Sequence, residues 1–495
     1  MDWIVNLPLF AVVACLISAV VSSVLPGKAA RQLSLSLCSA VAVGFGLLTY
    51  YGAAAGVGTT YLMGHYPHPW GNELYFAILE PLLVCVFAVV MGLCLLGGKK
   101  HLEEDLENGK HRMYYVMSDL VLSALIVLST TNDIFTGYVF IEICTIASCG
   151  LLMIRQIGRT TLASIRYMIF SLIGSGLFLL GVILLYAITG HLLMPNLKDS
   201  IGALWESGDY RISLLTAMSL ITIGLAIKSG LFPFHFWMPD TYGYATPASG
   251  GILSGLVSKG YIFFLLRVIF RVFGTDVFYR SGLSNILFVF GTVGIMVGSI
   301  SALREKDVFR MIAYSSAAQI GYIYMGIGIS PALGALAAVF HILTHAITKP
   351  PLFLSAAQLT DTAGGRKRGD WRGAGQRNKL AALTFTVCAF SMIGIPLTMG
   401  FVSKYRFAMA AFERTNLLVP TLIVLALSTI LNAWYFMRVI IGLYLMPRTE
   451  NLNRLTVGGQ GVYSVSAIAF VGMNILLGVA AEPLVQLLER GLGLL

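Results

Sequence analysis

Apolar segments of about 20 residues recur along almost the whole chain, and each is long enough to cross a hydrocarbon core of about 30 Å as one helix. Only 11% of the residues are charged, against about 25% in soluble domains, so the composition excludes a water-soluble globular protein. The expected spans are 4–24, 33–52, 74–97, 112–130, 133–154, 163–189, 212–232, 247–267, 283–303, 310–328, 331–357, 379–403, 418–442 and 461–487. We therefore predict an all-α polytopic membrane protein with about 14 transmembrane helices.

Lysine and arginine residues gather in every second loop between these spans. The rich loops lie near 28–31, 99–112, 155–166, 304–310, 366–379 and 448–454. Basic loops stay in the cytoplasm, so a multi-pass protein of the cell inner (cytoplasmic) membrane is predicted, with both termini on the outer side. The most basic loop, 358–378, is expected to hold this topology, with contact to anionic lipid or a cytoplasmic partner as the alternative.

Seven cysteines occur, all within apolar runs, and none forms a CxxC pair or a cluster with histidine. Such cysteines pack as small apolar side chains. We therefore predict no cofactor, no metal ligand and no catalytic residue in this chain. The net charge of +10 reflects the basic loops of a membrane protein, and nucleic acid is not an expected partner.

Basic residues at the span ends, Arg267 among them, are counted with the loops. Five basic residues then remain in or directly beside the expected spans: Lys228, Lys259, Lys349, Lys404 and Arg438. An ionised side chain at the membrane centre costs about 2.5–3.5 kcal/mol on insertion scales. A purely structural bundle has no reason to accept that penalty. A buried lysine can lose its proton near neutral pH, whereas an arginine stays charged. The four lysines are therefore predicted to take part in ion translocation, and Arg438 to act as an anchor or counter-ion.

Three acidic residues also fall inside the spans. Glu142 is the lone acid deep in span 133–154 and is the expected counter-ion for one of the lysines. Glu80 and Asp119 lie nearer to the span ends, so we expect them to pair with basic loop residues. A direct part in transport is the alternative for both.

His341, His345 and Lys349 follow one another at four-residue spacing. On a helix this spacing places all three on one face, about 6 Å apart along the axis. Two histidines and a lysine on one apolar helix indicate a proton relay. Zinc binding by the two histidines is the rival interpretation, and the sequence shows no third ligand for it.

Two lysines lie beside expected helix breaks. Lys228 precedes Pro233 by five residues, and Lys404 follows a glycine- and proline-containing run around Pro396. The breaks fall in the seventh and twelfth spans, an odd offset that predicts two inverted five-helix repeats, helices 4–8 and 9–13. The expected organisation is 1–110 for helices 1–3, 111–270 for the first repeat, 280–442 for the second repeat and 443–495 for helix 14.

Several of these segments resemble a known family. The run 228–240 (Lys-Ser-Gly-Leu-Phe-Pro-Phe-His-Phe-Trp-Met-Pro-Asp), together with Lys259 and the segments 340–349 and 394–404, resembles the antiporter-like subunits. These occur in respiratory complex I, membrane-bound energy-converting hydrogenases and Mrp-type cation/proton antiporters. A lysine at position 404, where some members carry glutamate, makes the chain most similar to the D-type Mrp subunit and its hydrogenase relatives.

The resemblance implies a Glu142–Lys228 ion pair in one half-channel and Lys404 as the gate of the other. It implies a central hydrophilic axis of Lys259, His341, His345 and Lys349. This chain departs from the family pattern at 245–248 (Ala-Thr-Pro-Ala), which lacks one proline, and at Pro350-Pro351. The double proline predicts a kink in span 331–357 just past the relay lysine.

The residues and the resemblance together predict a proton, or cation/proton, translocating subunit of a multisubunit membrane complex. That complex is either a larger oxidoreductase, of the NADH dehydrogenase or hydrogenase kind, or an Mrp antiporter. The expected partners are other membrane subunits, the lipid bilayer and H⁺, with Na⁺ left open. The alternatives are a stand-alone secondary transporter of a small solute and a quinone-site subunit of a redox enzyme.

Overall fold

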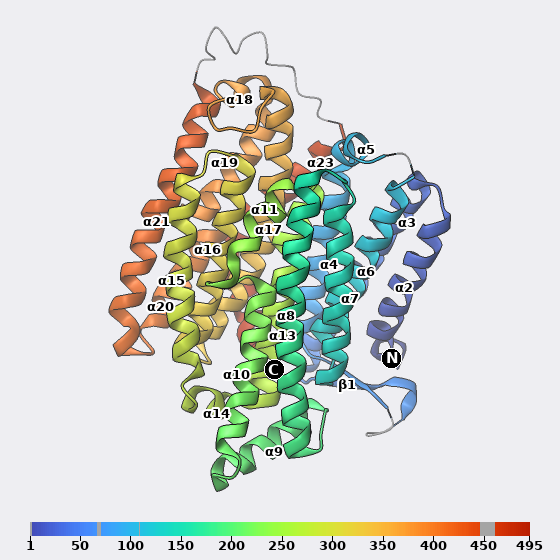
Figure 1. The fold of residues 1–495 in the computed structure, drawn as a ribbon, viewed down its shortest axis with the longest axis vertical. Helices are drawn as coiled ribbons and strands as arrows, with labels where there is room; N and C mark the ends of the chain where they lie inside the picture. Colours follow the sequence, from blue (N-terminus) through green and yellow to red (C-terminus); the bar gives the residue numbers. More distant parts are fainter. Residues whose placement is uncertain (1, 67–70, 108, 446–460) are drawn as a thin grey trace.

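The computed structural model describes residues 2–66, 71–107, 109–445 and 461–495, which form a bundle of long helices (Figure 1). The loop 446–460, which carries two of the arginines used for the orientation prediction, lies outside the described residues. The first part of the chain contains α1 (Asp2–Val5), α2 (Leu7–Val24), α3 (Gly27–Ala55), β1 (Thr59–Leu62), η1 (Met63–His65), β2 (Glu73–Phe76), α4 (Leu79–Gly97) and α5 (Lys99–Asp105).

The middle of the chain begins with five longer helices: α6 (His111–Thr130), α7 (Ile134–Met153), α8 (Gly158–Thr189), α9 (Met194–Ser207) and α10 (Arg211–Ser229). Shorter pieces follow: η2 (Phe234–Trp237), α11 (Met238–Tyr244), α12 (Pro247–Ile252), η3 (Leu253–Val257), α13 (Ser258–Val268), η4 (Ile269–Phe273) and α14 (Thr275–Arg280). The remaining helices are α15 (Leu283–Arg304), α16 (Val308–Ile329), α17 (Leu333–Ala363), α18 (Ala374–Arg377), α19 (Lys379–Ile393), α20 (Met399–Ala411), α21 (Thr415–Tyr444), α23 (Tyr463–Val479) and α24 (Ala481–Gly493).

The helical, polytopic character expected from the apolar segments is confirmed. Among the described residues, ten helices are long and apolar enough to cross a membrane, and the α23–α24 pair, bent by 79°, makes eleven. This is fewer than the expected count of about 14, because spans 310–328, 331–357 and 379–403 coincide with α16, α17 and the α19–α20 pair. These three are helical, but they are either less apolar than the others or interrupted. Almost all of α17 is buried in protein, so its polar residues do not meet lipid.

A two-stranded antiparallel sheet lies between α3 and α4, which the all-α prediction missed. Thr59 pairs with Phe76 and Leu62 pairs with Glu73. The expected span 74–97 therefore started too early, since its first residues belong to β2 and the helix begins only at Leu79. Figure 1 shows β1 at the same end of the bundle as α9, and both chain termini lie in that half.

Helices α10 and α19 end in the same way. Each stops at a glycine with a left-handed backbone, Gly230 with φ 80° and Gly394 with φ 91°. The next residue, Leu231 or Ile395, donates its backbone N–H back to the carbonyl of Ala226 or Phe390, at 3.0 Å in both cases. This is a common glycine stop signal, and it ends each helix shortly before a proline.

Helix α17 runs through Pro350 and Pro351 without interruption, from Leu333 to Ala363. A Cβ on Gly255, in the π-helical turn η3, would lie 2.7 Å from Pro350 Cγ, so only a glycine lets the two helices approach this closely. The prolines therefore pack into the neighbouring helix instead of dividing α17. The segment 247–273 is likewise buried, apart from the partly exposed Arg271, so α12–η4 and α17 form the centre of the bundle.

Candidate functional site

The predicted translocation residues lie on five helices that cross the interior: α7, α10, α13, α17 and α20. Lys228 is 1% exposed, and Lys259 and Lys349 are completely buried. Lys404 is partly buried, and the Glu142 side chain is 23% exposed. Arg438 is exposed on α21, near Arg368, which suits an anchor. The lysines therefore lie inside the bundle. The Glu142 carboxylate beside Lys228 is closer to the bundle surface.

Glu142 and Lys228 form a long ion pair. Their Oε1 and Nζ atoms are 4.0 Å apart, at the limit of direct contact. The Lys228 ammonium instead donates a hydrogen bond of 2.6 Å to the hydroxyl of Thr145, one turn from Glu142 on α7. The ring of Tyr261 lies 5.8 Å from the same ammonium. Lys228 thus sits between a carboxylate and a hydroxyl on one helix face, and a small movement would exchange one partner for the other.

Lys259 is held by backbone alone. Its ammonium donates to the carbonyl oxygen of Ser254 at 2.5 Å. Ser254 lies in the π-helical turn η3, a local widening of the helix that is frequent at functional sites because it frees backbone carbonyls. No carboxylate in the described part of the chain forms an ion pair with Lys259. Lys349 lies close enough to Lys259 for the two ammonium groups to repel each other.

The three residues that were predicted to form a relay, His341, His345 and Lys349, lie in one row on α17. The rings of His341 and His345 are 6.3 Å apart, and His341 Nδ1 lies 2.7 Å from the hydroxyl of Ser403. Lys349 donates to the Ile312 carbonyl at 3.0 Å and to the Ser315 hydroxyl. Neither ring nitrogen of His345 has a protein partner, although the side chain is completely buried.

The rival zinc interpretation gains no support from this geometry. Among the described residues, the one group of three candidate ligands within 4.8 Å of one another is His101, Glu104 and Asp361. That group lies near the end of α17, away from His341 and His345, and Lys100 already pairs with its Asp361 carboxylate at 2.7 Å.

Lys404 closes the gap left by the break after α19. Its ammonium donates to the carbonyl of Ile393, the last residue of α19, at 2.7 Å, and to the Thr429 hydroxyl at 2.8 Å. The Tyr322 ring lies 5.8 Å from this ammonium and 5.6 Å from the His341 ring. Tyr322 therefore connects the α17 row with Lys404.

Sequence reasoning missed the hydroxyl partners of this row. They are Thr145 for Lys228, Ser315 for Lys349, Ser403 for His341 and Thr429 for Lys404. The bridging ring of Tyr322 was missed as well. Serine and threonine are common in membrane helices, so composition gives them no prominence. The available signal was position: Thr145 follows Glu142 by three residues, and Ser403 directly precedes Lys404.

A second buried ion pair joins Glu80 to a basic residue, as expected, but the location expected for that basic residue was wrong. Glu80 pairs with Arg267, at 4.0 Å between Oε1 and Nε, and both side chains are completely buried. Arg267 was placed in a loop, but the helix continues through α13 and η4 to Phe273, so it is internal. It also donates to the Ser129 carbonyl at 2.6 Å. The expectation that Asp119 pairs with a loop base was also wrong, because its partner is the Ser18 hydroxyl at 2.6 Å.

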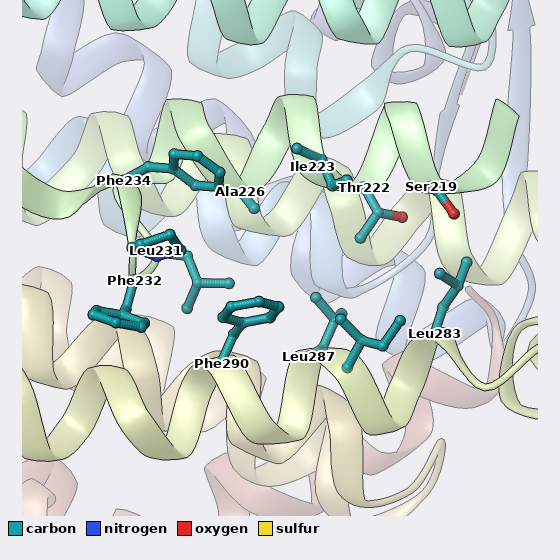
Figure 2. A pocket seen from close by; sticks show the side chains of 12 residues that line it. Ser219, Thr222, Ile223, Ala226, Leu231, Phe232, Phe234, Leu283, Leu287 and Phe290 are labelled. Carbon is teal, nitrogen blue, oxygen red and sulfur yellow. The ribbon is translucent and has the colours of Figure 1, made fainter. Parts of the chain in front are cut away.

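An apolar pocket of about 180 Å³ lies beside the first helix break, between α10 and α15. Figure 2 shows Phe232 and Phe290 between the two helices, with Leu287 further along the same gap and Ile223 on α10. None of the residues that line this pocket has an ionisable side chain. The pocket is therefore separate from the lysine row and has too few polar groups to select a polar solute.

Comparison with known proteins identifies the class. The family model described as "NADH:quinone oxidoreductase/Mrp antiporter, TM" matches residues 131–431. The chain is 33% identical over 390 residues to NADH-quinone oxidoreductase subunit N of Desulforudis audaxviator, covering 78% of this chain and 75% of that protein. It is 28% identical over 429 residues to the D-type subunit of the Na(+)/H(+) antiporter of Alkalihalophilus pseudofirmus, covering 86% and 83%.

A similar fold is known in a solved complex. One chain of the membrane-bound sulfane sulfur reductase, an archaeal respiratory membrane complex, superposes with a TM-score of 0.88 at 26% identity, covering 99% of this chain and 96% of that one. The chain belongs to the NADH:quinone oxidoreductase/Mrp antiporter transmembrane family. The resemblance seen in the motifs is thereby confirmed.

Proposed function

We propose that this chain is the proton-translocating, antiporter-like subunit of a multisubunit membrane complex. The observation that carries the proposal is the buried row from Lys228 through Lys259 and Lys349 to Lys404, in which one carboxylate, Glu142, is in ion-pair contact. Several ammonium groups in a low-dielectric interior repel one another. They cannot all hold a proton at once, so the protonation of one lysine depends on that of its neighbours.

Protonation is coupled along the row because Lys228 has two alternative partners, Glu142 and Thr145. With Glu142 close, the charged form of Lys228 is favoured; when Lys228 turns to Thr145 it loses that support and can give up its proton. His345 lies near both Lys259 and Lys349 and carries two ring nitrogens without protein partners, so it suits transfer between them. Tyr322 and Ser403 then place His341 beside Lys404.

We further propose that the chain crosses the membrane about 14 times, with inverted repeats at helices 4–8 and 9–13. The matched glycine stops of α10 and α19 support this arrangement. The repeats would occupy 111–270 and 280–442, preceded by helices 1–3 in 1–110 and followed by helix 14 within 443–495. Both termini would lie on the outer side, as the basic loops predict.

The names of the relatives support the proposed partners. One relative belongs to an NADH-quinone oxidoreductase, another to an Na(+)/H(+) antiporter, and the solved neighbour to a respiratory membrane complex. We propose that this chain likewise works beside other membrane subunits and lipid. Protons are its proposed cargo, since each group in the row exchanges H⁺.

The test is proton translocation by the native complex in sealed vesicles. Lys228→Ala and Glu142→Ala should abolish translocation while the complex assembles normally, as judged by co-purification of its other subunits. Lys198→Ala, on the surface helix α9, is the matched control and should pump as the unmodified complex does. Normal pumping by either of the first two variants would refute the proposal.

A further inference from the structure

Asp119 is a buried acid outside the lysine row and outside the family-matched region 131–431. It lies about 12 Å along α6 from His111, where that helix packs against α2 and α3. The side chain is 1% exposed. Its Oδ2 accepts the hydrogen bond from Ser18, and its Oδ1 has no partner.

The surroundings of this carboxyl are polar but carry no compensating charge. The Ser34 hydroxyl adjoins the carboxyl from α3, and the Ser22 and Ser123 hydroxyls lie one turn away on α2 and α6; all three are buried without a hydrogen-bond partner. The titratable groups that interact with the carboxyl are Cys15 from α2 and Cys38 from α3, and Cys94 from α4 interacts with Cys38. Tyr115 lies one turn before Asp119 on α6 and interacts with Arg31 of α3.

No described basic side chain neutralises Asp119. Arg31 lies one turn before Ser34 on α3, but its guanidinium acts on Tyr115 and forms no ion pair with Asp119. An isolated ionised carboxylate in such a site is very costly, and in proteins the group takes up a positive charge or becomes neutral instead. The site therefore calls for a bound cation.

The coordination around the carboxyl favours a proton over a metal cation. Two hydroxyls reach the Asp119 carboxyl: that of Ser18 donates a hydrogen bond of 2.6 Å, and that of Ser34 adjoins it. Hard metal cations of the Ca²⁺ or Mg²⁺ kind take about six or more oxygen ligands. A proton needs one carboxyl oxygen, and the unpartnered Oδ1 is available for it.

We propose that Asp119 is a second proton-binding site of this chain, separate from the lysine row, which exchanges H⁺ through the end of the α2–α3–α6 bundle marked by Ser22 and Arg31. The Ser22 hydroxyl lies one turn beyond Ser18 towards that end of α2, and Arg31 lies near the start of α3. The site stands on its own geometry and does not depend on the proposed function.

The experiment is labelling by dicyclohexylcarbodiimide, which reacts with a protonated buried carboxylic acid. The carboxyl oxygen bonds to the carbodiimide carbon, and the proton passes to a carbodiimide nitrogen. A lipid-facing groove between α3 and α4, which includes Cys38, leads the apolar reagent from the bilayer towards this region. Membranes containing the full complex are labelled over a range of pH, and the adduct is located by mass spectrometry.

The peptide that carries Asp119 should be labelled at low pH and lose the label as the pH rises. Asp119→Asn should remove the adduct completely. Ser18→Ala removes the hydroxyl that stabilises the anion, so its labelling should persist to higher pH by about one unit or more. Ser36→Ala, which removes an exposed hydroxyl on α3 outside this groove, is the control and should follow the unmodified profile.

Two outcomes would overturn the proposal. One is the absence of a pH-dependent adduct at Asp119 in the unmodified protein. The other is protection by Na⁺, against choline at equal ionic strength, which would make the site a metal-cation site. The Ser18→Ala profile keeps the test decisive if Asp119→Asn does not assemble, because an unchanged profile also contradicts the proposal.

Discussion

The Lys404 ammonium lies 2.7 Å from the carbonyl oxygen of Ile393, the last residue of helix α19. A helix end leaves carbonyls without intrahelical partners and carries partial negative charge, so a cation there is favoured. The lysine proposed as the gate of the row is therefore also the residue that closes the break. Releasing its proton weakens both this contact and the bond to Thr429.

This dual role makes the choice of substitution informative. Lys404→Arg keeps a cation at the end of α19 but cannot release a proton, so the complex should assemble while translocation falls to about one tenth or less. Lys404→Ala should lose both translocation and stability, because it leaves the α19 carbonyl without its donor. Proton uptake by vesicles and thermal unfolding in detergent measure the two effects. Tyr405→Phe, at the neighbouring exposed position, should change neither.

Tyr322 should matter through its ring. Its hydroxyl has no partner in the structure, whereas its ring lies 5.7 Å from the Phe407 ring and contacts His341 and Lys404. Tyr322→Phe is expected to retain most of the translocation rate. Tyr322→Leu should slow it severalfold and cost about 1–3 kcal/mol of stability, through lost packing and aromatic contact. Equal rates in the two variants would show that the ring does not position the row.

The Glu80–Arg267 pair should behave as a coupled unit. Removing one partner of a buried ion pair leaves an uncompensated charge and costs about 3–5 kcal/mol. Glu80→Gln and Arg267→Met should each lower the unfolding temperature of the detergent-solubilised protein, and the double variant should lose less than the sum of the two. Additive losses in this double-mutant cycle would mean that the two side chains act independently.

The packing of α5 on α17 should depend on pH. Partial burial opposes ionisation of Asp361, but hydrogen bonds from His101 and Lys100 outweigh it and lower the pKa of this carboxyl. The same contact raises the pKa of Lys100. A lowered acid pKa means that this stabilisation is present at neutral pH and is lost as the pH falls below about 3.9.

Hydrogen exchange of the α5 amides, corrected for the intrinsic rate, measures that loss. Protection should be unchanged from pH 7 down to the acidic range and then decrease, and Asp361→Asn should remove it at pH 7 as well. The free energy that the Asp361 contact contributes to α5 packing is about 1 kcal/mol or less, because the Lys100–Asp361 pair is partly exposed. Glu103→Gln, which removes an exposed pair at 3.9 Å, is the control and should leave α5 protected.

The long apolar segments located the helices well because a membrane span must be continuous, hydrogen-bonded and about 20 residues long. The helical character of the expected spans, and the stops close to Pro233 and Pro396, follow from residues near in sequence. The loop position predicted for Arg267 was wrong because the helix continues beyond the length needed to cross the lipid. The helix is enclosed by protein there, and no local sequence signal marks that enclosure.

The partners within the site depend on how helices meet, which one chain segment does not encode. The contact between His341 and Ser403 joins residues 62 positions apart, and that between Lys349 and Ser315 joins residues 34 apart. The sequence was therefore enough to identify the titratable side chains and to place His341, His345 and Lys349 on one helix. The hydroxyls that orient them, and the pairing of Glu80, required the packed structure.

The uninterrupted passage of α17 through Pro350 and Pro351 has a consequence for the path itself. Each proline lacks the N–H that would bond to the carbonyl four residues earlier, so the oxygens of Ala346 and Ile347 lose their partners within the helix. These two residues lie between His345 and Lys349 in sequence. The main chain of α17 thus offers two hydrogen-bond acceptors along the row, and acceptors of this kind do not titrate. They can stabilise a charged lysine or a passing hydrated proton at any pH, whichever side chains are protonated.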